Sequence, residues 1–540
     1  MKLERINTMK LNDNSIEWAI IHNKEMKDTD LFPIPKEIEI FFDNLDETVK
    51  AFKDIDFPNY EWQSARRYLI PKKELSYRMA TQLNPLDSVL FTAIIHQFGE
   101  YIEKRRISIH ENKVFSYRFS PNKLGYMYTL EDSWKYFWME SSMKMNNYKY
   151  AVYLDISDFY NQIYHHTVEN ELKESNIPNA ITKSLIKLLG KLTAKTSRGI
   201  PVGPHGSHLL AEMTLIPLDN FMSLKCDDFC RYADDIIIFC NDRKDAEKAV
   251  YEIAEFIDSN QRLILNSGKT KIYDKSEFND LCTSMIQDNP INDLESEMVD
   301  TLNRYSINLY TLSRVVKLEE KDLECFSKEK IETCLDSYLN QPEPNFDRIK
   351  WLYRRLSQIR VDTAVEYTTN NLTKLTPAIF EIINYLVSVG ESEMCTLNLH
   401  DVGDLIFKLY DDKLVKCNPY LQMSLISLFS GSKNYNHIRK LTDMFRYSSD
   451  DIKREILLAC YNSETSNILY GWIYGLKEQS GNFSDWTRRA YYITCSMMLT
   501  ENKKFYFKDT KGENILDDYL IRWALKNTAP SETKVELNFS

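Results

Sequence analysis

The chain has 540 residues, of which 43% are hydrophobic and 27% are charged, and it carries a formal net charge of −11. That length exceeds what a single hydrophobic core usually serves, so we expect two or three domains. No apolar run is long enough to cross a bilayer and no secretory signal is apparent, so we expect a cytoplasmic protein without a membrane partner. The ten cysteines form no CxxC pair, and His205 and His208 with Cys226 and Cys230 lack zinc spacing, which argues against a disulfide framework and a zinc site.

A negative net charge disfavours broad binding to phosphate groups, so any surface of that kind must be confined to local basic clusters. One cluster comprises Arg66, Arg67, Lys72, Lys73 and Arg78. A second comprises Lys104, Arg105 and Arg106, and here a solvated helix face and contact with phosphate are equally compatible with the sequence.

Three prolines interrupt residues 1–61, where we expect an irregular N-terminal arm with one or two short helices. Over residues 62–285, short β-branched and aromatic runs such as YKYAVYLDI and CRYADDIIIFC alternate with helix-like stretches such as KDAEKAVYEIAEFIDSN. This alternation predicts an α+β domain.

From about residue 290 strand signals nearly vanish, and apolar residues recur at helical spacing. Ile349, Leu352, Leu356 and Ile359, for example, fall on one helical face. Similar segments follow one another with turn-like stretches between them. This predicts an all-α domain of stacked helical hairpins, a HEAT-like repeat, over residues 290–528. Residues 529–540 are expected to form a flexible tail.

The strongest chemical signal is the sequence RYADD at residues 231–235, which lies between two strand-like runs. It predicts a β-hairpin that presents two acids at its turn. Adjacent ionised carboxylates repel each other, and a divalent metal ion would relieve that repulsion. A solvated Asp-rich turn, the usual explanation of an isolated pair, does not account for the apolar runs on both sides.

A second acid, Asp155, ends the predicted strand AVYLD. We expect Asp155 and Asp234 to hold two Mg²⁺ ions, with Mn²⁺ as a substitute, in a site that activates a 3′ hydroxyl and neutralises departing pyrophosphate. Asp158 lies at an offset that would face away from such a site, and we expect it to help cap the helix that follows.

These motifs, in this order over residues 62–273, resemble the reverse-transcriptase family. YADD resembles that family's metal-binding turn, and YLDISDFY resembles its first aspartate strand. The resemblance implies a palm-and-fingers fold and DNA synthesis from dNTPs. It also implies metal ligation by Asp155, Ile156 and Asp234, with Asp235 as a further catalytic residue.

The resemblance implies roles for other residues that carry little signal alone. Tyr160 matches the aromatic gate that excludes a ribose 2′ hydroxyl, although an isolated tyrosine is more often part of a core. Lys269, in an element with Asn266 and Thr270, matches the lysine that protonates pyrophosphate. The other implied nucleotide or template contacts are Lys72, Lys73 and Arg78, which hold the triphosphate, and Pro201 and Gly203 of the loop 197–204.

Two departures from the family pattern stand out. Val202 replaces the Gln that templated members commonly carry, and no maturase or zinc segment precedes the long helical half. That layout, with GIPVGPHGSHLLAE and FYNQIYHHT, resembles the bacterial abortive-infection reverse transcriptases of the AbiA and AbiK type. It implies an anti-phage enzyme that assembles as a homo-oligomer and makes single-stranded DNA, with or without an RNA template.

Two other functions stay open on the sequence. One is a retron or retroelement polymerase that copies a defined RNA, which requires an RNA gene beside this one. The other is a non-catalytic helical scaffold, although the intact Asp155, Asp234, Tyr160 and Lys269 argue against a vestigial site. Within the helical half, the aromatic and arginine-rich segment around Trp486 is a candidate contact for a second subunit or the product, and the alternative, ordinary helix-core aromatics, is favoured for any single residue.

Overall fold

The computed structural model describes residues 10–29, 31–73, 75–129, 132–286, 292–305, 317–435, 437–463, 467–508 and 510–527. The chain forms two compact units. Met1–Arg67 and Ala80–Asn289 form the first, the sheet unit, while Tyr68–Met79 and Pro290–Ser540 form the second, the helical unit. The sequence suggested boundaries near 61, 285 and 528. Instead, the N-terminal residues join the sheet, and a short internal segment joins the helices. The expected tail at 529–540 lies outside the described residues.

Regular helices stand where the sequence suggested an irregular N-terminal arm. Three of them pack on one another and the first also packs on a fourth: α1 (Asp13–Glu25), α2 (Lys36–Asp43), α3 (Leu45–Phe52) and α4 (Pro85–Glu103). The side chain of Asn12 caps α1 by accepting a hydrogen bond from the amide of Ser15. Ile16 and Ile20 of α1 are fully buried, so this region is part of the core of the sheet unit.

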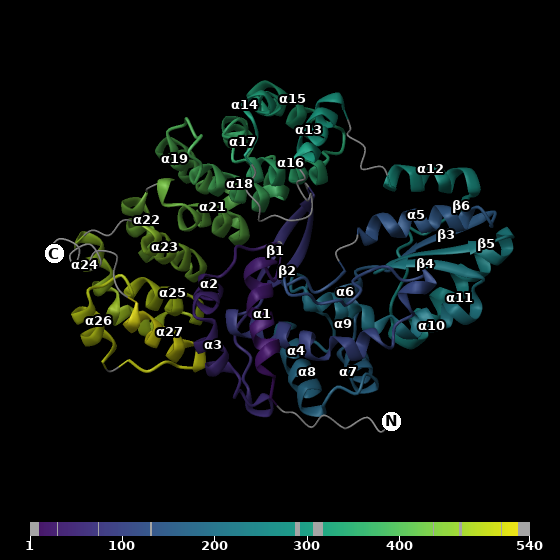
Figure 1. Ribbon diagram of the computed structural model, residues 1–540, viewed down its shortest axis with the longest axis horizontal. Helices are drawn as coiled ribbons and strands as arrows, with labels where there is room; N and C mark the ends of the chain where they lie inside the picture. Colours follow the sequence, from purple (N-terminus) through teal and green to yellow (C-terminus); the bar gives the residue numbers. More distant parts are fainter. Residues whose placement is uncertain are drawn as a thin grey trace. The chain divides into compact units, whose positions relative to one another are not determined.

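A four-stranded antiparallel sheet of order β4-β5-β3-β6 organises the sheet unit (Figure 1). Its strands are β3 (Tyr150–Asp155), β4 (Asp228–Tyr232), β5 (Asp235–Cys240) and β6 (Lys271–Asp274). β4 and β5 form the hairpin that RYADD predicts, and β3 lies beside β5. The α+β prediction is therefore confirmed for this part of the chain.

Helices cover both faces of the sheet (Figure 1). They are α5 (Ser133–Met145) and α12 (Lys275–Ile286) on one face and α11 (Arg243–Gln261) on the other. Alternate residues of β5 are buried on opposite faces of the sheet. Ile237 and Phe239 pack in a core cluster with Trp138 of α5, while Ile236 and Ile238 are buried on the opposite face.

Short helices complete the sheet unit and carry the loops around the site. They are α6 (Phe159–Gln162), α7 (His165–Glu174), α8 (Asn179–Leu192), α9 (Gly206–Thr214) and α10 (Ile216–Lys225). α9 packs against α4, α7 and α10, so it joins the N-terminal helices to the region beside the sheet.

The helical unit contains a two-stranded sheet segment and a long series of helices. The strands are β1 (Arg66–Lys73) and β2 (Ser76–Gln82), of which residues 68–79 belong to this unit. The helices are α13 (Asp293–Arg304), α14 (Glu320–Leu323), α15 (Lys328–Leu339), α16 (Phe346–Ile359), α17 (Val365–Asn371), α18 (Ile379–Gly390), α19 (Leu399–Tyr410), α20 (Lys413–Cys417), α21 (Pro419–Gly431), α22 (Ile438–Met444), α23 (Asp450–Asn462), α24 (Asn467–Gly475), α25 (Asp485–Cys495), α26 (Thr500–Phe507) and α27 (Ile515–Lys526).

Successive helices of this unit stack in a row. α16 packs on α18, α18 on α21, α21 on α23, α23 on α25, and α25 on α27. The predicted amphipathic face of α16 is buried: Ile349, Leu352, Leu356 and Ile359 are all at most 4% exposed. The largely helical character expected for this half is therefore confirmed.

The segment around Trp486 is part of this stack. Trp486, Tyr491 and Tyr492 of α25 are buried. Arg488 and Arg489 both donate hydrogen bonds to the carboxylate of Asp517 in α27. The expected contact surface is therefore wrong for this segment, and the alternative of helix-core aromatics is correct, because α25 is covered by both of its neighbours in the row.

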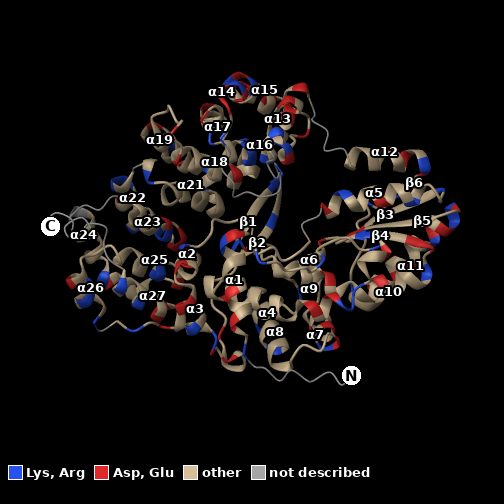
Figure 2. Cartoon of the chain, in the orientation of Figure 1, with Lys and Arg blue, Asp and Glu red and all other residues tan. Residues whose placement is uncertain are grey.

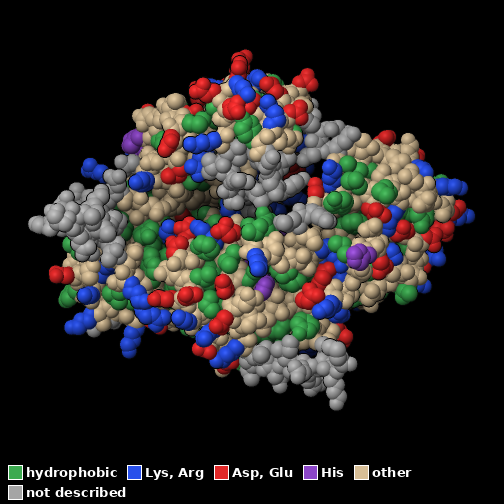
Figure 3. Space-filling model, in the orientation of Figure 1, with side chains coloured by type: hydrophobic (Ala, Val, Ile, Leu, Met, Phe, Trp, Pro, Cys, Tyr) green, Lys and Arg blue, Asp and Glu red, His purple; other side chains and the backbone are tan. Residues whose placement is uncertain are grey.

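Among the described residues, no helix is both long and apolar enough to span a membrane. Figure 3 shows acidic and basic side chains interspersed on the visible face of each unit. The net charge of −11 is thus not gathered into a single acidic field on that face.

Candidate active site

The β4–β5 turn places Asp234 at the tip of the hairpin. Tyr232 and Asp235 are the last paired residues, so Ala233 and Asp234 form a two-residue turn. Ala233 adopts a left-handed backbone conformation with φ 50°, which is costly for a residue with a Cβ. Its amide donates to Oγ of Ser116 at 2.9 Å, and its carbonyl accepts from Arg231 at 3.0 Å. Side chains beneath the turn therefore hold its strained backbone in place.

Three acidic residues lie near one another at this end of the sheet. Asp155 and Asp235 are cross-strand partners on one face, and the amide of Ile156 donates to the carbonyl of Asp234 at 3.3 Å. Burial, followed by the negative charge of Asp235, raises the pKa of Asp234 to about 6, and Asp155 adds to this effect. The structure thus brings Asp155, Asp234 and Asp235 together.

Lys269 and Asn266 hold the carboxylate of Asp155. Lys269 Nζ lies 2.5 Å from Oδ2 of Asp155, and Asn266 Nδ2 donates to Oδ1 at 2.9 Å. Asp155 is 3% exposed, whereas the side chain of Lys269 is 56% exposed. The lysine can therefore swing away while the aspartate stays. Lys269, which is expected to protonate pyrophosphate, thus forms an ion pair with Asp155, a predicted metal ligand.

The donor set suits a divalent cation. Carboxylate oxygens are the ligands that Mg²⁺ and Mn²⁺ prefer. Burial and the neighbouring acids disfavour the charged form of Asp234, and a bound cation would favour it. Asp155 and Asp234 are the residues that would hold it. Ile156 is buried next to them, and ligation by its carbonyl stays a prediction.

Metal binding at these carboxylates predicts a gain in thermal stability. At a Mg²⁺ concentration about tenfold above its Kd, the folded state gains about 1.4 kcal/mol, which corresponds to a rise in Tm of about 3–5 °C for a unit of this size. Differential scanning fluorimetry of the parent and of Asp234→Asn, with and without Mg²⁺, measures this rise. An equal rise in both proteins would place the ion elsewhere.

Asp235 and Asp158 have protein partners. Asp235 accepts a hydrogen bond from the hydroxyl of Tyr153, and burial raises its pKa. Asp158 occupies the N-cap position of α6, but its carboxylate accepts from the side-chain amides of Asn161 at 2.6 Å and Gln162 at 3.0 Å. Asp158 thus stands at the expected N-cap position, but its side chain does not form the expected hydrogen bond to a backbone amide of the helix. The reason is its φ of 50°, because an N-cap side chain reaches those amides from an extended backbone.

The loop 197–204 is clamped between α6 and β2. The amide of Ile200 donates to the carbonyl of Tyr160 at 2.8 Å, and the amide of Thr81 donates to the carbonyl of Val202 at 2.8 Å. Gly203 has a φ of 133°, and a Cβ at this position would lie 2.4 Å from the carbonyl oxygen of Thr81. Only glycine fits there. The structure therefore fixes Pro201 and Gly203 in a loop bonded to Tyr160, which lies half-buried on α6.

Figure 2 shows basic residues on β1 and β2. Those between residues 68 and 79 belong to the helical unit, whereas Arg66 and Arg67 belong to the sheet unit. Lys72, Lys73 and Arg78 are exposed, and Lys73 Nζ lies 4.0 Å from Glu343. These three residues are in a different unit from Asp155, so their expected contact with a triphosphate stays a prediction.

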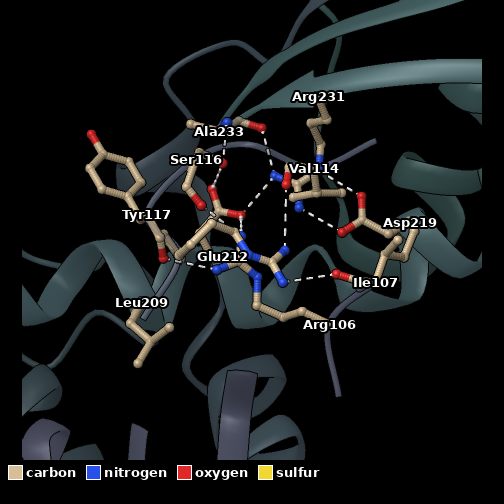
Figure 4. Close-up of polar contacts among 12 residues, drawn as sticks. Arg106, Ile107, Val114, Ser116, Tyr117, Leu209, Glu212, Asp219, Arg231 and Ala233 are labelled. Atoms are coloured by element: carbon tan, nitrogen blue, oxygen red, sulfur yellow. Dashed lines mark hydrogen bonds and ion pairs between the residues drawn. The ribbon is translucent and has the colours of Figure 1, made fainter. Parts of the chain in front are cut away.

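Sequence reasoning missed a buried charge network beneath the turn (Figure 4). Glu212 of α9 accepts hydrogen bonds from Arg106 at 2.7 Å and from Oγ of Ser116 at 2.6 Å, and it lies 3.0 Å from Arg231. Arg231 also donates two hydrogen bonds of 2.6 Å to Asp219. The side chains of these four charged residues are at most 1% exposed. Ser116 connects the network to the amide of Ala233.

Burial alone lowers the pKa of Arg231, but the charges of Asp219 and Glu212 outweigh burial and hold it above its usual range. Arg231 therefore stays charged inside the unit. A charged residue within the apolar run that leads to the turn was the signal that could have revealed a buried partner for Arg231.

In the second basic cluster, Lys104 is exposed and lies 3.4 Å from Glu100. Arg105 and Arg106 form neither a solvated face nor a phosphate contact. Arg105 pairs with Glu171 at 2.8 Å. Arg106 lies in the buried network. Both expectations for Arg105 and Arg106 are wrong because their acidic partners come from α7 and α9, far along the chain.

Among the described residues, only His400, Asp404 and His437 bring three potential metal-binding atoms within 4.8 Å of one another. Asp404 is hydrogen-bonded to Lys440 and to Nε2 of His437, and these bonds lower its pKa to about 2. The two histidine rings stack with centroids 4.2 Å apart, so their in-plane lone pairs do not converge. We interpret the group as an ion-paired cluster in the helical unit.

The chain was compared with protein-family models and with curated proteins. Residues 70–284 match the family model of the reverse transcriptase (RNA-dependent DNA polymerase) domain. The matched range includes the three carboxylates, Lys269, Tyr160 and the loop 197–204. A search of curated proteins finds no match.

Proposed function

Because residues 70–284 form a reverse-transcriptase domain and the chain is therefore a nucleotidyltransferase, we propose that it joins deoxynucleoside triphosphates into DNA at the carboxylates of β3 and the β4–β5 turn. The observation that carries this proposal is the meeting of Asp155, Asp234 and Asp235 beside Lys269 at one end of the sheet. Three acids with one exposed lysine match a site that handles metal-bound phosphates.

The residues divide the work as follows. Asp155 and Asp234 would hold two Mg²⁺ ions. Bound there, the ions would activate the 3′ hydroxyl and offset the charge of the departing pyrophosphate. Burial lowers the pKa of Lys269, but its hydrogen bond with Asp155 and the acid charges outweigh burial, so the lysine stays protonated. Once it leaves Asp155, Lys269 can donate a proton from Nζ to the pyrophosphate.

The test is nucleotide incorporation by the full-length protein. Purified protein is given labelled dNTPs with Mg²⁺ or Mn²⁺, once with an oligo(dT) primer on poly(rA) and once without template. We expect a DNA product in at least one arm. No product in any arm, from protein that is folded by circular dichroism, contradicts the proposal and favours the non-catalytic scaffold.

Nucleic acid that copurifies with the protein distinguishes templated from untemplated synthesis. It is released by protease and sequenced. A single recurring sequence indicates that a defined RNA is copied, as in the retron alternative, whereas varied sequences indicate synthesis without a template.

We further propose that the enzyme acts in bacterial anti-phage defence as a homo-oligomer of the abortive-infection type. The support is the layout, a reverse-transcriptase domain followed by a long stack of helices, together with the loop sequence GIPVGPHGSHLLAE. Phage plaques are counted on cells that express the parent or Asp234→Asn. Equal plaque numbers argue against a defence role, and a monomer mass by light scattering argues against the oligomer.

A further inference from the structure

The hydroxyl of Tyr160 is anchored to a histidine from another helix. Oη of Tyr160 lies 2.6 Å from Nδ1 of His208 on α9, and the two rings are nearly perpendicular, at 85° with centroids 5.8 Å apart. The backbone carbonyl of Tyr160 is held at the same time by the amide of Ile200. The tyrosine is therefore fixed at both ends, at its backbone on α6 and at its hydroxyl on α9.

His208 is itself held in one orientation. Its ring stacks on Tyr117 with centroids 4.0 Å apart and an interplanar angle of 1°. The carbonyl of Tyr117 accepts a hydrogen bond of 2.9 Å from buried Arg106. Tyr128 lies at the edge of the same stack, and its hydroxyl donates to the carbonyl of His205 at 2.6 Å. The acceptor of the Tyr160 hydroxyl is thus immobilised by packing and by the buried charge network.

The protonation states of Tyr160 and His208 determine which of the two side chains donates their hydrogen bond. Burial, and then the charge of His205, lower the pKa of His208 to about 3, so the imidazole is neutral in any assay near neutral pH. Burial also raises the pKa of Tyr160 well above its usual value, so the phenol keeps its proton. Tyr160 therefore donates and Nδ1 of His208 accepts, with the histidine proton on Nε2.

This inference rests on the proposed function and concerns the sugar of its substrate. We propose that His208 is the positioning residue for sugar selectivity: it fixes the ring of Tyr160 against the nucleotide, so that deoxyribonucleoside triphosphates are accepted and ribonucleoside triphosphates are excluded. Steric exclusion of one hydroxyl works only while the excluding ring cannot tilt. A phenylalanine at position 160 would be held at its backbone end alone, which explains why a hydroxyl is useful here.

The test compares kcat/KM for the same base on deoxyribose and on ribose. Tyr160→Phe and His208→Phe should each lower this ratio about tenfold, the change expected for one lost hydrogen bond. The double variant should lower it no further than either single variant, because both remove the same bond. His208→Asn should keep the ratio of the parent, since its amide oxygen can replace Nδ1 as the acceptor.

His96→Phe is the matched control. His96 also stacks on an aromatic ring, that of Trp18 at 4.4 Å, and its Nδ1 lies 2.9 Å from a hydroxyl, that of Ser15. We expect His96→Phe to leave the ratio of kcat/KM for the two sugars unchanged. If His208→Phe acted only through a general loss of packing, it too would lower kcat/KM for both sugars and leave their ratio unchanged.

The inference is overturned if Tyr160→Phe and His208→Phe incorporate dNTPs with the ratio of the parent, or if their effects add in the double variant. Tyr160→Phe lacks only a hydroxyl and decides the question if His208→Phe does not fold. A parent protein that incorporates neither sugar overturns the proposed function itself, and this inference with it.

Discussion

Replacing Asp234 or Asp155 by asparagine is expected to lower the rate of dNTP incorporation about 10³-fold or more, and at Asp234 to do so without loss of stability. Metal-assisted charge stabilisation is worth several kcal/mol, and each 1.36 kcal/mol is a factor of ten in rate. The raised pKa of Asp234 means that its charge is unfavourable in the folded protein, so the neutral amide should leave Tm unchanged or raise it. A lower rate with an unchanged or higher Tm distinguishes an acid that acts in catalysis from one that stabilises the fold.

The measurement pairs single-nucleotide incorporation with thermal unfolding for each variant. Asp227→Asn is the control, because Asp227 is an exposed residue just before β4, at the far end of the same hairpin. It should match the parent in both assays. Parent-like rates in Asp155→Asn and Asp234→Asn would show that the metal site lies elsewhere in the chain.

Glu212→Ala should produce a large loss of stability in the sheet unit. It removes one of the two buried acids that balance Arg106 and Arg231, and it leaves Oγ of Ser116 without its acceptor. Breaking a buried ion pair by removing one partner typically costs about 3–5 kcal/mol. For a unit of this size that corresponds to a fall in Tm of about 10 °C.

Thermal unfolding followed by circular dichroism measures this loss. Glu100→Ala is the matched control, because Glu100 pairs with Lys104 at 3.4 Å on the surface at the end of α4, a few residues before Arg106. Its unfolding temperature should equal that of the parent. If Glu212→Ala also unfolds at the temperature of the parent, the network does not hold the unit together.

Local patterns in the sequence were sufficient for the hairpin and its acids. Strand-like runs on both sides of RYADD fix a two-residue turn at Ala233 and Asp234, and the run ending at Asp155 supplies the neighbouring strand. The antiparallel pairing of β3 with β5, which neither run specifies alone, then places Asp155 opposite Asp235.

Pairings between distant segments could not be predicted in the same way. Arg106 looked like one of three surface cations because its partner Glu212 lies far along the chain. His208 looked like part of a stray histidine and cysteine grouping because its partner is Tyr160 on another helix. Periodicity reports which face of an element is buried, but not which charged or polar group on a remote element meets it.

The grouping of residues 68–79 with the helices has a consequence for synthesis on the ribosome. Tyr68 packs on Tyr420, with ring centroids 6.1 Å apart, and Lys73 is near Glu343. Tyr420 is made roughly 350 residues after Tyr68, which is a delay of roughly 20–70 s at the usual rates of elongation. Until then the strands that carry Lys72, Lys73 and Arg78 lack their packing partner. A chain released before about residue 420 would keep every acid of the candidate site and still lack the support for these basic residues, so translation must pass deep into the helical half before the strands can settle.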